Sequence, residues 1–315
     1  MVILPWENQT VESFVLRGFS SIQELNIFLF MMFLVFYILI VSGNILIVLL
    51  VLFSHRLHTP MYFFLVNLSF LEIWYTSNIV PKMLIIILAK QKTISVSGCL
   101  AQFYFFGSLA ATECLLLAVM SYDRYLAICQ PLHYPILMTG PFCVRLAASS
   151  WLCCFLLTAV TMVLLSRLTF CGPNEIDHFF CDFTPLVHLS CMDTSLTEMV
   201  AYSTSSAVTL FPFLLITASY SCILAVILRI PSGTGRQKAF STCSSHLTVV
   251  IVFYGTLIAT YLVPSANSSQ LLRKGFSLLY TILTPMFNPL IYSLRNRDIL
   301  EALKKCWSKK PDFLV

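Results

Sequence analysis

The sequence contains few charged residues. Only 10% of its 315 residues are Asp, Glu, Lys or Arg, whereas 58% are hydrophobic. Soluble domains carry roughly a quarter charged residues. A chain this apolar cannot cover its surface with polar groups in water, so we expect lipid to surround it.

Several motifs are also absent. The sequence has no HExxH zinc motif, nucleophile elbow or glycine-rich phosphate loop, which argues against an enzyme. It has no inverted repeat or pair of broken apolar segments, which disfavours a transporter or channel with Glu72 and Glu113 as its ion path. The first apolar stretch lacks a basic flank and a small-residue cleavage site, so we expect no cleavable signal peptide. No nucleic-acid partner is expected.

Seven apolar stretches are long enough to cross a membrane as helices. They cover residues 27–53, 60–80, 99–129, 146–166, 199–228, 238–262 and 272–294. The sequence therefore predicts an all-α membrane protein, with a seven-transmembrane helix bundle at residues 26–294. The remaining parts are an N-terminal segment (1–25) and a tail (295–315), in which apolar residues at helical spacing opposite lysines predict a short amphipathic helix.

The distribution of basic residues predicts the orientation. Twelve of the nineteen lysines and arginines lie on the face that carries the C-terminus. Because basic residues concentrate on the cytosolic side, we expect a cytoplasmic C-terminus and an extracellular N-terminus. Asn8, followed by Gln9 and Thr10, then becomes a candidate glycosylation site.

Charged residues inside or beside the apolar stretches are candidates for function. Glu72 and Glu113 lie within predicted helices, where a carboxyl group is costly unless it faces the interior with a partner. They are either protonated and hydrogen-bonded or share a cation. Asp123 and Arg124 end the third stretch, and this pair alone is as consistent with a membrane-edge anchor as with a functional role.

Four cysteines fall on the predicted exterior: Cys99, Cys171, Cys181 and Cys191. An even set in an oxidising compartment suggests two disulfides, with three possible connectivities. A rival interpretation is a metal site made by His178, Cys181 and Asp182, which the spacing allows, but disulfides are favoured. Cys306 in the tail is either a palmitoylation site or a thiol that faces the membrane.

Three helical stripes in the predicted outer half are candidates for ligand contact. By chemistry alone, such stripes more often serve packing than binding. They comprise Phe106, Gly107, Ala110 and Ala111; Tyr202, Ser205, Ser206 and Thr209; and Tyr254, Leu257, Ile258 and Tyr261.

Four motifs carry a family resemblance. LHTPMYFFL begins at Leu57, MSYDRYLAIC at Met120, KAFSTCSSHL at Lys238 and PMFNPLIY at Pro285. In this order and spacing they closely resemble olfactory receptors of the tetrapod-type class (class II), within the rhodopsin-like G-protein-coupled receptors. The resemblance covers most of the chain.

The resemblance implies a function. Such receptors lie in the plasma membrane, bind odorants between the third, fifth and sixth helices, and activate a stimulatory (Gs/Golf-type) G protein that raises cyclic AMP. The three stripes would then line the odorant cavity. Tyr254 and Gly255 stand where other rhodopsin-like receptors commonly have Trp-Pro, and Phe106 stands where amine receptors have Asp. We therefore expect small, neutral, mostly apolar volatile ligands.

The resemblance also assigns roles to single residues. Asp123, Arg124 and Tyr125 would control G-protein coupling, with Asn288, Pro289 and Tyr292 as an activation hinge in the seventh helix. The disulfides would be Cys99–Cys181 and Cys171–Cys191. Glu72 and Glu113, with Asn44 and Asn288 nearby, would hold a sodium ion that favours the resting state, and no other cofactor is expected.

Overall fold

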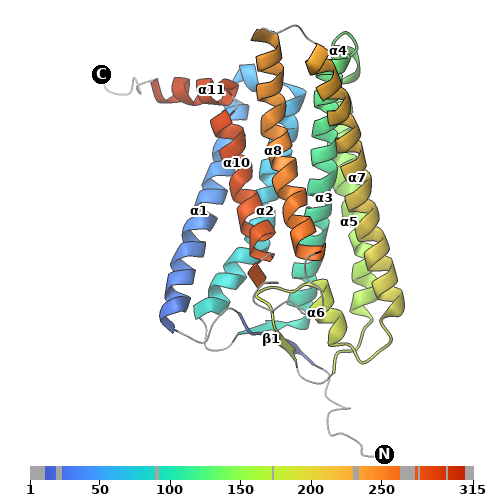
Figure 1. The fold of residues 1–315 in the computed structure, drawn as a ribbon. Helices are drawn as coiled ribbons and strands as arrows, with labels where there is room; N and C mark the ends of the chain where they lie inside the picture. The colour runs from blue at the N-terminus through green and yellow to red at the C-terminus, as the bar shows by residue number, and fades with distance from the viewer. Residues whose placement is uncertain are drawn as a thin grey trace, which may run out of the picture. The chain divides into compact units, whose positions relative to one another are not determined.

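The computed structural model describes residues 11–18, 23–88, 92–171, 174–229, 234–262, 274–275, 277–295 and 297–308. Most of them lie in long helices, drawn in chain order from blue to red in Figure 1. The long elements are α1 (Gln23–Phe53), α2 (Pro60–Leu88), α3 (Val96–Cys129), α5 (Gly140–Ser166), α7 (Ser195–Arg229), α8 (Thr234–Leu262) and α10 (Thr284–Arg295), the last preceded by the π-helical turn η2 (Leu279–Leu283).

The predicted membrane segments are confirmed as helices. Within the described ranges, α1, α2, α3, α5 and α7 are long and apolar enough to cross a membrane, and shorter apolar helices cover His246–Ile258 and Leu279–Ile291. The predicted end of the second helix near residue 80 is wrong, because α2 continues through Pro81 to Leu88. A proline removes one backbone hydrogen bond, which membrane helices tolerate where neighbouring groups compensate.

The chain divides into two compact units, of which the first comprises Met1–Ile38, Trp74–Thr112 and Trp151–Leu210. This unit contains a three-stranded sheet in the order β2–β1–β3, where β1 (Ser13–Leu16) pairs antiparallel with β2 (Thr93–Ser95) and parallel with β3 (Glu175–Ile176). The sheet was not predicted, because strands of two to four residues leave no readable periodicity. Its alternation nevertheless buries Phe14 and Leu16 completely.

The long loop that follows α5 is more ordered than the sequence indicated. It contains β3 and the short helix α6 (Phe183–His188), which lie between the predicted membrane segments. Asp182 begins α6, since its Oδ1 accepts a hydrogen bond of 2.8 Å from the backbone N–H of Phe183. Such an N-cap satisfies one of the free N–H groups at a helix start. Burial raises the pKa of the Asp182 carboxyl, while the bond to Phe183 opposes this shift.

The second unit comprises Leu39–Ile73, Glu113–Ser150 and Phe211–Val315. Its core is apolar and includes fully buried Phe64, Leu117 and Val249. Two short helical segments, η1 (His55–Leu57) and α4 (Tyr134–Leu137), connect its long helices. The predicted tail helix is present as α11 (Arg297–Ser308), which buries Ile299 in the same core.

Candidate functional site

Two acids are buried inside the second unit. The Glu72 and Glu113 residues are 0% and 2% exposed, and their carboxyl groups lie close enough to interact with each other. Two carboxyl groups can share a hydrogen bond only if at least one carries a proton. The two acids therefore either hold a proton between them or share a cation, the two alternatives that the sequence leaves open.

Asn288 joins the two acids. Its side-chain amide donates a hydrogen bond to Oε1 of Glu72 and lies near enough to Glu113 to influence its carboxyl group. Oε1 of Glu113 is buried and has no hydrogen-bond partner among the described residues. The cluster of Glu72, Glu113 and Asn288, called here the acid cluster, thus includes a buried Glu113 oxygen without a hydrogen bond from the described residues.

Asn44 is buried as expected but does not bond to the acids in the described structure. It is 1% exposed, and its side-chain amide donates to the carbonyl of Ile40, 3.0 Å away in the same helix. The neighbouring Gly43 allows α1 to approach α10 closely, since a Cβ atom there would lie 3.3 Å from Cβ of Pro289. The Asn44 position therefore contributes to packing, and the acid cluster is built from the other three residues.

A second polar cluster surrounds Asp123 near the end of α3. Nε of Arg124 donates to Oδ2 of Asp123 at 2.9 Å, and the Tyr134 hydroxyl donates to Oδ1 at 2.9 Å. Asp123 is fully buried, and Arg124 shows 13% of its side chain. We call Asp123, Arg124 and Tyr134 the arginine cluster.

The arginine cluster adds a residue to those predicted. Adjacent helix positions do not face one another squarely, but the long side chain of Arg124 folds back onto Asp123. Tyr134 was missed, because it lies outside the motifs in a short connecting helix. Burial, and secondarily the charge of Asp123, raises the pKa of the Tyr134 hydroxyl, which keeps it protonated as a donor.

The other expected activation residues fall in the second unit. The Tyr125 hydroxyl accepts a 3.3 Å hydrogen bond from Gln130, and Pro289 lies inside α10 beside Gly43. The side chain of Tyr292 lies outside the described residues, as does Asn8 at the N-terminus. An additional contact was not foreseen: the Tyr220 hydroxyl lies 2.6 Å from Nδ1 of His246, and both side chains are buried.

The stripes of α3 and α7 belong to the first unit, where aromatic residues of the long loop contact both. Phe106 lies 5.1 Å from Phe180 between ring centroids, and Tyr202 lies 5.8 Å from Phe183. Gly107 faces α5 rather than an open space, since a Cβ atom there would lie 3.2 Å from Thr158.

The remaining stripe residues vary in exposure. Ala110, Ala111 and Thr209 are half-buried, whereas Ser205 and Ser206 are exposed. In the second unit, Tyr254 is buried against Phe213, Leu257 is half-buried and Ile258 is 49% exposed. The side chain of Tyr261 lies outside the described residues.

Both disulfides expected from the resemblance are present. Cys99 bonds to Cys181 and Cys171 to Cys191, with Cα atoms 5.5 and 5.8 Å apart. The rival metal site is contradicted, because a disulfide sulfur is no thiolate ligand and Asp182 caps α6. Within the described part of the chain, no group of three His, Cys, Asp or Glu residues is placed to hold a metal ion.

Comparison with known proteins identifies the family. A family model described as olfactory receptor matches residues 33–310. The chain belongs to the olfactory receptor family. Human olfactory receptor 11A1 is 52% identical over 305 residues, covering 97% of this chain and 96% of the relative. Human olfactory receptor 6F1 is 51% identical over 304 residues, covering 96% and 99%.

The fold agrees with this assignment. Squid rhodopsin superposes with a TM-score of 0.73 over 92% of this chain and 82% of its own, at 17% sequence identity. The olfactory receptor therefore has the seven-helix rhodopsin-like fold. As a member of this family it is a multi-pass membrane protein that signals rather than catalyses, with odorants as ligands and G proteins as partners. The enzyme and transporter hypotheses are set aside.

Proposed function

We propose that this receptor binds small, volatile, mostly apolar molecules within its helix bundle and activates a stimulatory G protein of the Gs/Golf type, which raises cyclic AMP. The arginine cluster is the observation that carries the coupling part. Its buried carboxylate holds Arg124 on one oxygen and Tyr134 on the other. In this resting arrangement the guanidinium is withheld from partners outside the bundle.

Activation then amounts to a shift between two states. Odorant contacts favour a state in which the inner end of the bundle opens and Arg124 leaves Asp123. The released guanidinium would contact the C-terminal helix of the G protein. A ligand shifts this equilibrium only by its difference in affinity for the two states.

The composition of the candidate contact residues supports a neutral ligand. The stripes on α3, α7 and α8 contain apolar, aromatic and hydroxyl side chains and no charged residue. Sites of this composition bind apolar molecules and orient them with a few hydrogen bonds. An odorant with a permanent charge would bury that charge without a partner, which is costly.

The test is a cyclic-AMP reporter in cells that express the receptor, screened with a panel of neutral volatiles. We expect at least one volatile to raise cyclic AMP in the wild type, and Arg124→Ala to keep odorant binding while losing the rise. Arg145→Ala is the matched control, because Arg145 is exposed and donates only to its own helix at Pro141. A fall in cyclic AMP, or intact signalling in Arg124→Ala, would contradict the proposal.

We further propose that the acid cluster holds a sodium ion in the resting state. Carboxylate and amide oxygens are ligands suited to a hard cation, and Oε1 of Glu113 is buried without a hydrogen-bond partner in the described part of the chain. Glu72, Glu113 and the carbonyl oxygen of Asn288 would be the ligands. Loading would require the release of any proton that the two carboxyl groups hold.

We also propose that the receptor lies in the plasma membrane with its N-terminus outside and its C-terminus in the cytosol. The excess of basic residues on the C-terminal face supports this orientation. The disulfides Cys99–Cys181 and Cys171–Cys191 favour an oxidising environment for that end of the molecule.

A further inference from the structure

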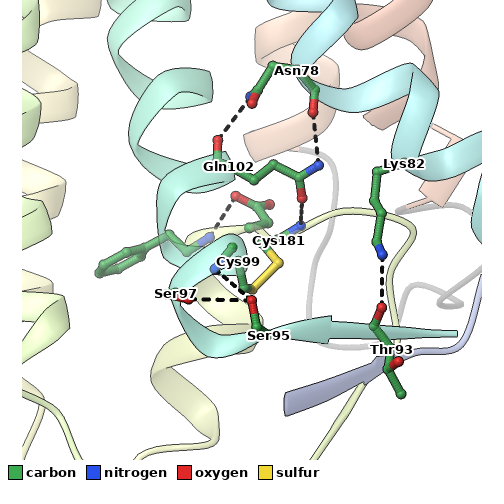
Figure 2. The surroundings of a disulfide bond; sticks show 11 residues. Asn78, Lys82, Thr93, Ser95, Ser97, Cys99, Gln102 and Cys181 are labelled. Atoms are coloured by element: carbon green, nitrogen blue, oxygen red, sulfur yellow. Dashed lines mark hydrogen bonds between the residues drawn. A yellow bond between two sulfur atoms is a disulfide. The ribbon is translucent and has the colours of Figure 1, made fainter. Parts of the chain in front are cut away.

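Gln102 connects three parts of the first unit by hydrogen bonds. Its Oε1 accepts from the backbone N–H of Cys181 in the long loop at 3.0 Å, and its Nε2 donates to the Asn78 carbonyl of α2 at 3.1 Å. Asn78 returns a bond of 3.0 Å to the Gln102 carbonyl of α3. Figure 2 shows these bonds beside the Cys99–Cys181 disulfide. Since Gln102 is only 6% exposed, both ends of its amide are used in a buried place.

The loop residues next to Cys181 contact candidate odorant residues. Phe180 packs on Phe106 of α3, and Phe183 packs on Tyr202 of α7. Phe183 also lies 6.0 Å from Phe103, one position after Gln102 on α3. Small rotations of the backbone at Cys181 would therefore move rings on both sides of it.

The disulfide and the Gln102 bond restrain different atoms of the same residue. The disulfide holds the Cys181 side chain at Cys99 but leaves rotations about its own single bonds. The Gln102 bond holds the peptide N–H of Cys181. Two attachments at one residue fix both the position and the direction of the loop backbone, which one attachment does not.

Replacement of the Gln102 amide would affect the loop, because of what surrounds this side chain. A groove of about 470 Å³ lies against the same residues and is lined by Asn78, Lys82, Thr93, Ile94, Ser95, Gly98, Ala101, Gln102 and Phe105. Its polar lining and open mouth suit water. A side chain without the Gln102 amide would leave the Cys181 N–H, which is fully buried, without its acceptor.

We propose that Gln102 is a positioning residue for odorant recognition, which holds the loop around Cys181 so that Phe180 and Phe183 face α3 and α7. It acts through the loop and need not touch the ligand. This inference rests on the proposed odorant binding and adds to it a determinant of sensitivity and of ligand size. To the extent that the odorant-bound state depends on this bond, its loss reduces odorant affinity by up to about tenfold.

The experiment compares three variants of the full-length receptor. Gln102→Met keeps the length but removes the hydrogen bonds, and Gln102→Glu restores an acceptor for the Cys181 N–H. Lys82→Met is the matched control. Lys82 lines the same groove, but its Nζ donates a hydrogen bond of 2.9 Å to the Thr93 carbonyl and not to the loop around Cys181. The readouts are the half-maximal concentration for small and large odorants, maximal response, surface level, and hydrogen exchange of the peptide that contains Cys181.

We expect Gln102→Met to raise the half-maximal concentration about tenfold, unequally for small and large odorants, and to speed exchange at the Cys181 amide. Surface level and maximal response should stay unchanged. Gln102→Glu should recover exchange protection, and Lys82→Met should resemble the wild type.

Two results would overturn the inference. One is unchanged sensitivity and unchanged exchange in Gln102→Met. The other is an equal loss of surface level and of response to every odorant, which a merely structural role would give. If no volatile changed cyclic AMP in the wild type, the proposed function would be contradicted independently of this inference. Hydrogen exchange at the Cys181 amide would still decide whether Gln102 positions the loop.

Discussion

The Tyr134 hydroxyl donates a 2.9 Å hydrogen bond to Oδ1 of Asp123, the carboxylate whose other oxygen holds Arg124. One buried acid therefore holds two donors from different segments of the second unit. The Tyr134 bond orients the carboxylate toward Arg124 and stabilises the resting pair.

We predict that Tyr134→Phe raises basal cyclic AMP. Removing one hydrogen bond from the resting state costs it about 0.5–1.5 kcal/mol, which corresponds to about a two- to tenfold larger active population. The measurement is reporter activity without odorant, normalised to surface receptor. Tyr122→Phe is the control, because Tyr122 is an exposed tyrosine of α3, one position before Asp123. Basal activity at the wild-type level in Tyr134→Phe would show that this bond does not restrain Arg124.

We predict that Glu72→Gln abolishes any sodium dependence of basal activity. The change removes one carboxylate from the acid cluster while it keeps the size of the side chain and its contact with Asn288. Basal cyclic AMP is measured in permeabilised membranes over a series of NaCl concentrations at constant ionic strength. Glu198→Gln, in the first turn of α7, is the control. If basal activity still responds to sodium in Glu72→Gln, the acid cluster is not the sodium site.

We predict that the two disulfides contribute unequally to stability. Cys99–Cys181 closes a loop with a sequence separation of 82 residues, and Cys171–Cys191 one of 20. The chain-entropy model gives about 4.5 kcal/mol for the longer loop and about 3.3 kcal/mol for the shorter. Paired serine variants should therefore unfold in the order Cys99/Cys181 first, then Cys171/Cys191, then wild type. The unfolding temperature of each variant is measured in detergent with a thiol-reactive dye. The reverse order of unfolding would contradict the prediction.

We predict that Asn8 carries a glycan. If the N-terminus is extracellular, Asn8→Gln should remove a glycosidase-sensitive shift in gel mobility. Asn67→Gln is the control, because Asn67 lies half-buried within α2 and its amide donates to the Phe63 carbonyl. A wild-type receptor without the shift, together with an N-terminal tag detected only in permeabilised cells, would reverse the proposed orientation.

The site could be predicted only in part. Glu72, Glu113, Asp123 and Arg124 stand out because charge is rare in this sequence, so each charged residue near an apolar stretch is noticeable. Their partners are less visible. Tyr134 lies in a short helix without periodicity, and Gln102 is an ordinary polar residue on a helix. Nothing local marks either residue as a partner of a buried group.

The sequence by itself determined the class of protein, the approximate positions of the seven helices and the family. It could do so because lipid leaves only the helix to satisfy the backbone of each apolar segment, and because four motifs lie at fixed spacing along the chain. The tertiary structure decided the three-stranded sheet, the hydrogen bond from Tyr134 to Asp123 and the attachment of Cys181 to Gln102, which is 79 residues away. These features depend on packing between separate segments of the chain, and composition and local periodicity do not encode which polar groups such packing brings together.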